Sequence, residues 1–453
     1  MLENIDILSL ANYCHAELSN KFVGNNEINN ITLDSRKVVA GSLFVAVKGD
    51  NHDGHDYVAN VVANPNCYAL VNHDFALDLP NLLRVQDTTL ALGLIASGYR
   101  QRFTLPVVAI TGSNGKTTVK EMLRAICITQ FGADHVLATA GNLNNHWGMP
   151  QTLLQLNVNH KVAIIEMGMN HAGELDYLSR LAQPTIALIN NVMFAHAGHF
   201  NGLSDIARAK GEIYHGLVAN NGTACINVSS EFAQLWLEKD VMSPIYLYGV
   251  PDSDCYIKEQ RIYSALYATP LGDVEIHLSI LGQHNYANAL TAIVAALHVG
   301  CSLDNIKAGL ESYHGYKGRL EQKLAFNGAR IIDDTYNANP DSVYAALSAI
   351  KHLPEPHWFI FGDLKELGEN EANYHKEIAV YASTHGISNL ITVGELSKVT
   401  HQHFEGNKIH FENNMDVVKY CTLYLPENAT LLVKGSNSMR LFDIVNKLVA
   451  TTE

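Results

Sequence analysis

VVAITGSNGKTT, residues 107–118, is the stretch that decides the fold. An apolar run leads into a turn that contains Gly112 and Gly115, and the turn is followed by Lys116 and Thr117. A buried strand, a glycine turn and a helix in this order can hold phosphate, because glycines let backbone N–H groups point inward and the helix directs its positive end at the anion. The stretch therefore predicts a nucleotide-binding α/β domain.

The side chains of this loop suit a nucleoside triphosphate. Lys116 supplies positive charge to the β- and γ-phosphates, and the hydroxyl of Thr117 can bind Mg²⁺. Ile110 stands where the common form of the loop has its first glycine, so this loop is a shorter variant. The alternative is an ordinary glycine turn, but a lysine followed by two threonines argues against it. The predicted nucleotide-binding residues of the loop are Gly112, Ser113, Asn114, Gly115, Lys116, Thr117 and Thr118.

The alternation of apolar strands and helices continues along the chain. Near-continuous apolar runs such as VAIIEMG, TIALINNV, HWFIFGD and TLLVKGS predict parallel sheets that helices cover on both faces. A helix is predicted over residues 282–300, and another begins at Pro340 with Asn339 as its N-cap. We therefore expect an α/β protein with three domains. They are a small mixed α/β domain at 1–84, a central P-loop-type parallel-sheet ATPase domain at 85–318 and a C-terminal Rossmann-like α/β domain at 319–453.

Composition excludes several classes of protein. The chain has 453 residues, a formal net charge of −14 and 47% apolar residues, which fits a folded protein of several domains. Its acidity argues against a nucleic acid or an anionic membrane as the main partner. Neither a signal peptide nor an apolar window of about 20 residues is visible, so we expect a cytoplasmic protein without membrane insertion. The seven cysteines form no C-x-x-C pair and predict buried thiols.

Polar residues after later strands are candidates for the rest of a site, since ligands bind beyond the carboxyl ends of strands in open α/β sheets. Glu166 follows the apolar run VAII and suits a cation, although a solvated loop acid is the alternative. Lys210, in ARAKGEI, would ordinarily form half of a helix-surface ion pair near Glu212. His196 is one of 22 histidines and, taken alone, would be a surface or structural residue.

The variant loop and three further stretches resemble the ATP-dependent Mur ligases and their relative folylpolyglutamate synthase. These stretches are EMGMNHAGEL, NNVMFAHAGHFNGLSDIARAKGEIYHG and GQHNYANALTAIVAA. The resemblance implies that Glu166 and His196 bind Mg²⁺, and that Lys210 is carbamylated by CO₂ beside the second of two Mg²⁺ ions. It also implies that Asn285 and Asn288 contact the adenine of ATP. Catalytic roles are implied for Lys116, His196 and Lys210.

Both ends of the chain extend the resemblance. In KGRLE and IIDDTYNANPDS, Arg319 is implied to reach the ATP phosphates and Asp334 to meet the ribose hydroxyls. A charge in a domain linker and an acid at a helix start are the respective alternatives. The stretch LDSRKVVAGSLFVAVKGDNHDGHDY resembles a UDP-sugar-binding domain, which implies that Ser35 and Arg36 contact uridine and diphosphate. Asn145, in AGNLNNHWGMP, is implied to face the sugar and peptide of the same substrate.

The motifs DDTYNANPDS and GDLKELG resemble the last ligase of the Mur series most, and the D-N-P-R signature of the preceding ligase is absent. The resemblance implies a monomeric ATP-dependent amide ligase that adds D-Ala-D-Ala to UDP-N-acetylmuramoyl-tripeptide through an acyl phosphate, in peptidoglycan precursor synthesis. Same-class alternatives are a diaminopimelate- or lysine-adding Mur ligase and a folylpolyglutamate synthase-like ligase. The different-class alternative is a nucleotide-driven switch or kinase. One departure is Asn437, where an arginine is expected.

Overall fold

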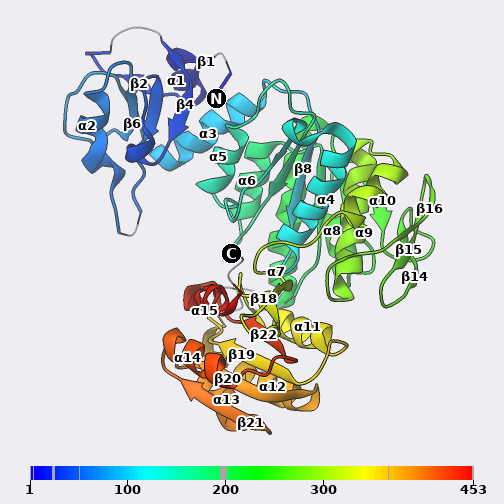
Figure 1. Ribbon diagram of the computed structural model, residues 1–453. Coiled ribbons are helices and arrows are strands. Elements are labelled where there is room, and N and C mark those ends of the chain that lie inside the picture. The colour runs from blue at the N-terminus through cyan, green and yellow to red at the C-terminus, as the bar shows by residue number, and fades with distance from the viewer. Residues whose placement is uncertain are drawn as a thin grey trace.

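The computed structural model describes residues 2–3, 5–22, 26–49, 51–193, 200, 202–365 and 367–450. Three domains follow one another in a bent arrangement, and the central domain connects the other two (Figure 1). The expected α/β fold with three domains is confirmed. All seven cysteines are free and buried, as predicted. Among the described residues, no helix combines the length and the apolarity that a membrane crossing requires.

The N-terminal domain is built on a five-stranded sheet in the order β2-β7-β6-β5-β4. The four strands from β4 to β7 run parallel, and β2 pairs antiparallel with β7. The strands are β2 (Glu17–Leu18), β4 (Asn30–Thr32), β5 (Ser42–Val45), β6 (Tyr68–Asn72) and β7 (Leu82–Val85). A ribbon of β1 (Ile5–Asp6) and β3 (Glu27–Ile28) and the helices α1 (Ile7–Tyr13) and α2 (Val58–Val62) complete the domain. The two short helices were not predicted.

Helix α3 (Thr88–Arg100) connects the N-terminal and central domains. It begins where the carboxylate of Asp87 accepts hydrogen bonds from the backbone N–H groups of Thr89 and Leu90. The helix contacts α1 in the N-terminal domain and α5 (Gly148–Leu153) and α6 (Glu174–Ala182) in the central domain. The predicted boundary after residue 84 lies close to the start of this helix and stays a prediction.

A six-stranded parallel sheet in the order β13-β12-β11-β8-β10-β9 forms the central domain. Its strands are β8 (Val107–Thr111), β9 (Val136–Ala138), β10 (Val162–Glu166), β11 (Ile186–Ile189), β12 (Thr223–Asn227) and β13 (Ile245–Tyr248). On one face Val107 and Ala109 pack in the core cluster that includes α3, α5 and α6. On the other, Val108 and Ile110 pack against α4 (Lys116–Phe131), α9 (His284–Val299) and α10 (Leu303–Glu311). This burial on both faces explains the near-continuous apolar strands.

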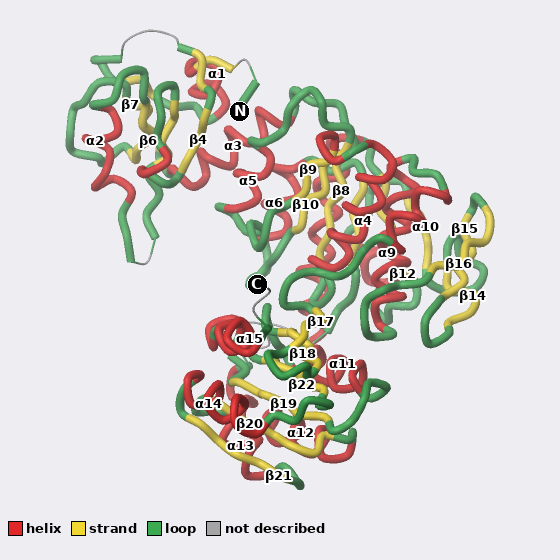
Figure 2. The backbone as a smooth tube through the Cα atoms, viewed as in Figure 1, coloured by secondary structure: helices red, strands yellow, loops and turns green. Residues whose placement is uncertain are grey.

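A small antiparallel sheet interrupts the predicted alternation of strands and helices in the central domain. Its strands are β14 (Tyr256–Gln260), β15 (Ala265–Thr269) and β16 (Gly272–Ile276), and it lies at the outer edge beside α10 (Figure 2). Two further helices, α7 (Leu203–Gly211) and α8 (Ala233–Lys239), precede it. This sheet was not predicted, because its strands lack the apolar runs typical of parallel strands.

The C-terminal sheet has the order β17-β18-β22-β19-β20-β21, and all its pairs are parallel except β17 with β18. The strands are β17 (Glu321–Leu324), β18 (Arg330–Asp334), β19 (His357–Gly362), β20 (Ile387–Val393), β21 (Asn407–Phe411) and β22 (Thr430–Lys434). The helices are α11 (Pro340–Ile350), α12 (Glu371–Thr384), α13 (Ser397–His403), α14 (Asn414–Tyr424) and α15 (Phe442–Leu448). The predicted boundary after residue 318 lies just before β17 and stays a prediction.

Candidate functional site

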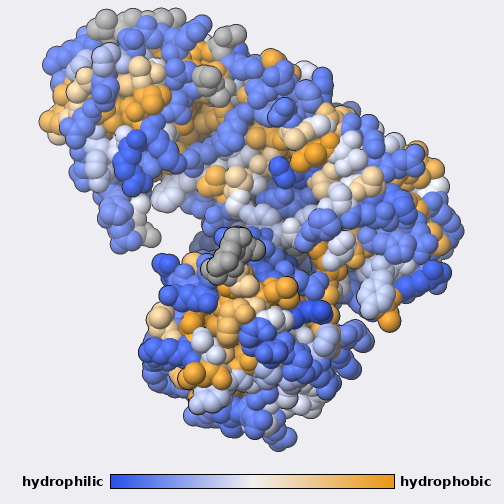
Figure 3. Space-filling model, viewed as in Figure 1, coloured by the Kyte–Doolittle hydropathy of each residue, from blue (hydrophilic) through white to orange (hydrophobic). Residues whose placement is uncertain are grey.

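A cleft of about 1370 Å³ lies where the central and C-terminal domains meet. The phosphate loop, the ends of β10 and β11 and the first turn of α9 line one side, and residues that follow β18 and β22 line the other. Figure 3 shows the molecule hollowed between its N-terminal and C-terminal parts. Predicted site residues that line the cleft are Ser113, Asn114, Gly115, Lys116, Thr118, Asn145, Glu166, Asn285, Asn288, Arg319 and Asp334. The predicted residues Gly112, Thr117, Lys210, Ser35 and Arg36 are not part of its lining.

The phosphate loop holds its lysine against its own backbone. The ammonium of Lys116 donates to the carbonyl oxygens of Gly112, at 2.6 Å, and Ser113, at 3.2 Å. Burial lowers the pKa of Lys116, Glu166 opposes this shift, and Arg319 adds to it. A phosphate oxygen in the cleft could replace these carbonyl acceptors. The loop therefore has the geometry of an anion site whose lysine is bonded to the loop's own backbone.

Gly115 cannot carry a side chain in this loop. Its φ is +76°, and an added Cβ would lie 2.5 Å from Asn288 Oδ1 and 2.6 Å from Asn190 Nδ2. We expect Gly115→Ala to destabilise the protein by about 1–2 kcal/mol or more, from the left-handed backbone alone. It should also weaken ATP binding, because the loop must shift. Thermal unfolding and calorimetric ADP titration would measure both effects, and Gly328→Ala, also at positive φ (+91°) but in open space, is the matched control.

Glu166 ends β10 as a buried carboxylate with only 2% of its surface exposed. One oxygen accepts a hydrogen bond from Asn144 Nδ2 at 2.8 Å, and the other, Oε2, has no hydrogen-bond partner among the described residues. The ammonium of Lys120, itself buried, lies 3.8 Å from Oε2. The alternative of a solvated loop acid is wrong. A buried carboxylate oxygen without a hydrogen bond, in a residue that lines the cleft, fits a Mg²⁺ ligand.

Lys210 is buried on α7, with 2% of its surface exposed. Burial, with a contribution from the charge of Lys116, holds the pKa of Lys210 well below its usual value. The alternative of a surface ion pair near Glu212 is wrong, because the Glu212 carboxylate instead accepts the backbone N–H of Gly173 at 2.8 and 2.9 Å. A neutral amine is the form that reacts with CO₂, so this environment suits carbamylation.

Of the other two predicted metal ligands, Thr117 and His196, the structure describes Thr117. Thr117 is buried at the start of α4, and its hydroxyl accepts a hydrogen bond from Arg319 Nη2 at 3.1 Å. His196 lies outside the described residues. No group of three or more His, Cys, Asp or Glu residues suited to a metal occurs in the part of the chain that the structure describes. Oxygen ligands from Glu166 and Thr117 fit Mg²⁺, which keeps several waters and needs few protein ligands.

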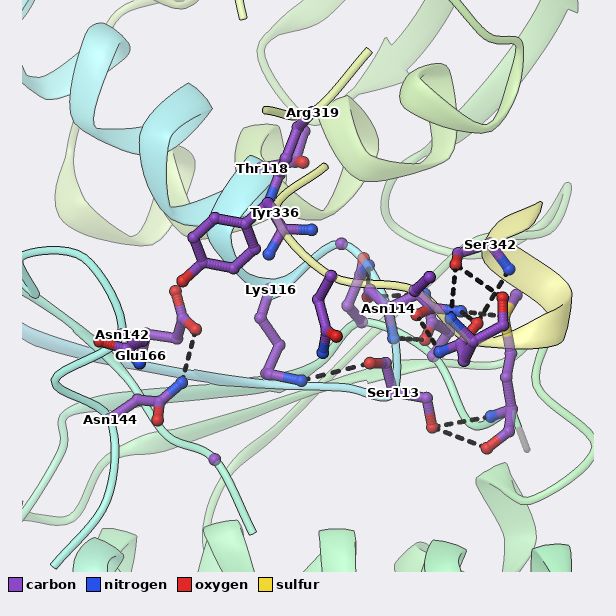
Figure 4. Close-up of a pocket in the computed structure, with 18 of the residues that line it drawn as sticks. Ser113, Asn114, Lys116, Thr118, Asn142, Asn144, Glu166, Arg319, Tyr336 and Ser342 are labelled. Carbon is purple, nitrogen blue, oxygen red and sulfur yellow. Dashed lines mark hydrogen bonds between the residues drawn. The ribbon is translucent and has the colours of Figure 1, made fainter. Parts of the chain in front are cut away.

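Arg319 crosses from the C-terminal domain to the phosphate loop. Its guanidinium lies 4.3 Å from the centroid of the Tyr336 ring and donates to Thr117, and its Nε is buried without a partner among the described residues. Figure 4 shows Tyr336 extending toward Glu166. Tyr336 was not predicted, although it lies in the motif IIDDTYNANPDS. The alternative of a simple linker charge for Arg319 is therefore wrong.

Asp334 ends β18 and pairs with a lysine that the sequence analysis also missed. Its Oδ2 lies 2.6 Å from the ammonium of Lys434, and its Oδ1 accepts the backbone N–H of Leu320 at 3.1 Å. The alternative of a helix-start acid is wrong, because the cap of α11 is Asn339. Lys434 ends the apolar strand β22, a position that could have identified it from the sequence. Both Asp334 and Lys434 line the cleft.

The two predicted adenine contacts are hydrogen-bonded to each other. Asn288 Nδ2 donates to Asn285 Oδ1 at 2.8 Å, and Asn288 Oδ1 accepts from Asn190 Nδ2 at 2.8 Å. Asn285 Nδ2 donates to the carbonyl oxygen of Leu281 at 2.6 Å. Asn190, which follows β11, was not predicted. The bond between Asn190 and Asn288 holds the start of α9 against the end of β11, and Asn190 Nδ2 also donates to the carbonyl oxygen of Asn114 in the phosphate loop at 3.0 Å.

The predicted UDP-substrate residues are spread over two domains. Ser35 and Arg36 lie in a short turn of the N-terminal domain, where the guanidinium of Arg36 pairs with Asp34 at 2.8 Å on the exposed surface. Asn145 lies in the central domain, and its Oδ1 accepts the backbone N–H of Gly148 at the start of α5 at 2.9 Å. The structure does not bring Asn145 together with the other two residues in the cleft.

Comparisons with known proteins match every domain of the chain. Three family models match it: the Mur ligase family catalytic domain over residues 27–76, the Mur ligase middle domain over 110–296 and the Mur ligase glutamate ligase domain over 318–437. The UDP-N-acetylmuramoyl-tripeptide–D-alanyl-D-alanine ligase of Haemophilus influenzae is 36% identical, covering 95% of this chain and 96% of that protein. The ligase of the same name from Escherichia coli is also 36% identical, covering 92% and 93%.

Solved structures of similar proteins share the whole architecture. The crystal structure of MurF from Acinetobacter baumannii superposes with a TM-score of 0.90 at 32% identity and covers 99% of both chains. That of MurF from Thermotoga maritima in complex with ADP has a TM-score of 0.81 at 23% identity and covers 92% of this chain and 96% of that one. At that identity the second likeness shows the fold alone.

Proposed function

This chain belongs to the Mur ligase family, and on that premise we propose that it is an ATP-dependent ligase that adds D-Ala-D-Ala to UDP-N-acetylmuramoyl-tripeptide in peptidoglycan synthesis. The observation that carries the proposal is the match to ligases named for this reaction over nearly the full length of both chains. The cleft supports it, because groups suited to a triphosphate converge there from two domains.

The reaction joins a carboxylate to an amine at the expense of ATP. An oxygen of the peptide's terminal carboxylate attacks the γ-phosphorus, the bond to ADP breaks, and an acyl phosphate forms. The amine of D-Ala-D-Ala then attacks the acyl carbon, phosphate leaves, and the nitrogen loses a proton to give the amide. Lys116 and Arg319 offset the repulsion between the anionic reactants. Mg²⁺, when bound at Glu166 and Thr117, would supply further positive charge.

We assign the nucleotide to the side of the cleft that holds the phosphate loop. Residues 112–118 surround its phosphates, Asn285 and Asn288 lie on the adenine side, and Asp334 lies on the ribose side. The hydrogen bonds that these groups make within the protein support the assignment, because ATP can replace them with equivalent bonds. Ser35, Arg36 and Asn145 are proposed to hold the UDP-linked substrate.

We further propose that Lys210 is carbamylated. The neutral amine adds to CO₂, forms a C–N bond and releases a proton, so a buried ammonium becomes an anion. The low pKa of Lys210 supports this step, because the amine is deprotonated nearer neutral pH. The anion would supply negative charge for a second Mg²⁺. The expectations of a monomer and of a cytoplasmic enzyme stay predictions.

Phosphate release tests the proposed function directly. We expect ATP hydrolysis to require both UDP-N-acetylmuramoyl-tripeptide and D-Ala-D-Ala, and each phosphate to accompany one new amide. A coupled phosphate assay with each substrate omitted in turn would measure this. Turnover without the amine would favour a switch or kinase, and turnover with a UDP-linked dipeptide and diaminopimelate or lysine would favour another Mur ligase. A glutamate-adding activity on folate would favour the folylpolyglutamate synthase alternative.

A further inference from the structure

Two asparagines form a reciprocal amide pair between the domains. Asn339 Nδ2 donates to Asn114 Oδ1 at 2.7 Å, and Asn114 Nδ2 donates to Asn339 Oδ1 at 3.4 Å. Asn114 belongs to the phosphate loop, and Asn339 begins α11 in the C-terminal domain. Both line the cleft and are half-buried. The pair is therefore a direct contact between the nucleotide loop and the other domain.

The cap of α11 determines how the pair is oriented. Asn339 Oδ1 accepts the backbone N–H of Ser342 at 2.9 Å, and the Ser342 hydroxyl accepts the backbone N–H of Asn339 at 2.9 Å. Because the carbonyl end of the amide faces the helix, its NH₂ end must face away from it. Asn114 Oδ1 is the acceptor at that place. The Asn339 side chain thus caps the helix through Oδ1 and contacts the phosphate loop chiefly through Nδ2, at 2.7 Å, with Oδ1 also accepting from Asn114 at 3.4 Å.

Both ends of the pair are held by further hydrogen bonds. On the loop side, the carbonyl oxygen of Asn114 accepts from the side-chain amides of Asn190 and Asn191, both at 3.0 Å. On the C-terminal side, Lys434 donates to the carbonyl oxygen of Asn337 at 3.0 Å, and Asn437 donates to that of Tyr336 at 2.8 Å. The segment 336–339 is therefore fixed to its own domain, and the loop to its own. Asn437, the departure from the family pattern, has a definite role here.

Arg319 depends on the same segment, because its guanidinium packs on the ring of Tyr336, three residues before Asn339. If segment 336–339 shifts relative to the loop, the guanidinium shifts relative to Thr117 and Lys116. We propose that Asn339 is a positioning residue: through its contact with Asn114, it fixes the position of the C-terminal domain relative to the phosphate loop. The effect of this contact on catalysis rests on the proposed function. The proposal assigns Asn339 no contact with a reacting atom.

A serine at position 339 separates the two tasks of the side chain. Asn339→Ser keeps a good helix cap but is too short to reach Asn114. Asn413→Ser is the matched control, since Asn413 Oδ1 likewise caps α14 and, among the described residues, the hydrogen bonds of its side chain stay within that helix. We expect Asn339→Ser to lower kcat about tenfold or more while KM for ATP stays within about twofold, because misplacement of a positioned group costs rate. Asn413→Ser should leave both unchanged.

Hydrogen–deuterium exchange supplies a readout that does not depend on activity. In Asn339→Ser we expect faster exchange in the segments 110–118 and 336–342, and no such change in Asn413→Ser. The double variant Asn114→Ser/Asn339→Ser should have the same kcat as Asn114→Ser alone, since each substitution removes the same contact between the two side chains.

Normal kcat and normal exchange in Asn339→Ser would overturn the proposal. Equal losses of kcat in Asn339→Ser and in the control Asn413→Ser would also overturn it. So would losses that add up when Asn114→Ser and Asn339→Ser are combined. If the unmodified protein shows no D-Ala-D-Ala-dependent phosphate release, the proposed function fails. The exchange comparison then still decides whether the amide pair sets the register of the domains, so the two failures can be told apart.

Discussion

Lys116→Ala is expected to lower kcat by about 10³-fold while the protein stays folded, because a charge that stabilises the transferring phosphate is typically worth a factor of that size. Among the described residues, the ammonium hydrogen-bonds to carbonyl oxygens of its own loop, at Gly112 and Ser113. Its removal therefore breaks no hydrogen bond to a carboxylate in that part of the chain. The loss should appear in kcat, since the charge matters most where negative charge moves between carboxylate and phosphate.

The measurement is steady-state phosphate release with saturating UDP-N-acetylmuramoyl-tripeptide and D-Ala-D-Ala. Lys307→Ala is the matched control, because Lys307 likewise donates to a backbone carbonyl, that of Glu275 at 2.6 Å, but lies on α10 outside the cleft lining. Thermal unfolding of both variants should match the unmodified protein within a few degrees. A folded Lys116→Ala protein with near-normal turnover would show that the loop does not act on the transferred phosphate.

Lys210→Ala is expected to be inactive, with kcat reduced by about 10²–10³-fold, a typical loss for a group that stabilises charge in the transition state. The physical reason is the loss of the proposed carbamate anion on α7. Small carboxylates such as acetate, added at high concentration, should restore part of the activity, because they can enter the space of the missing side chain and supply the same charge.

Lys116→Ala is the control for this rescue, since a carboxylate cannot replace a cation, and acetate should leave it inactive. A second readout is direct: protein equilibrated with ¹³CO₂ should show a carbamate carbon resonance that Lys210→Ala lacks. Full activity of Lys210→Ala without additives, or an unchanged carbamate resonance in that variant, would rule out the assigned role.

Local sequence predicted the elements that carry the site. The strand, glycine turn and helix at 107–131 form as expected, because Gly112 and Gly115 take backbone angles that suit the turn and the apolar run is buried on both faces. Helix α11 begins with Asn339 as cap and Pro340 as its first residue, as predicted. These features depend on interactions within a few residues, which is why a single sequence is sufficient to identify them.

Residues whose roles depend on burial could not be judged from the sequence alone. Lys210 and Glu166 each had a plausible exposed alternative, and only the packing of α7 and β10 shows that both are buried. The antiparallel sheet β14–β16 was missed as well, since its short strands lack the apolar runs of the central sheet. Burial is a property of what packs against a residue, and those partners lie far away in the chain.

The sequence by itself determined the phosphate loop, the alternation of strands and helices and, through its motifs, the Mur ligase resemblance. The tertiary structure alone decided how the domains meet: that Arg319 reaches Thr117, that Tyr336 packs beneath Arg319, and that Asn339 pairs with Asn114. The physical reason is separation along the chain. A hydrogen bond between residues about 200 positions apart leaves no periodic pattern in the sequence, and it forms only after two separately folded sheets have brought their strand ends together.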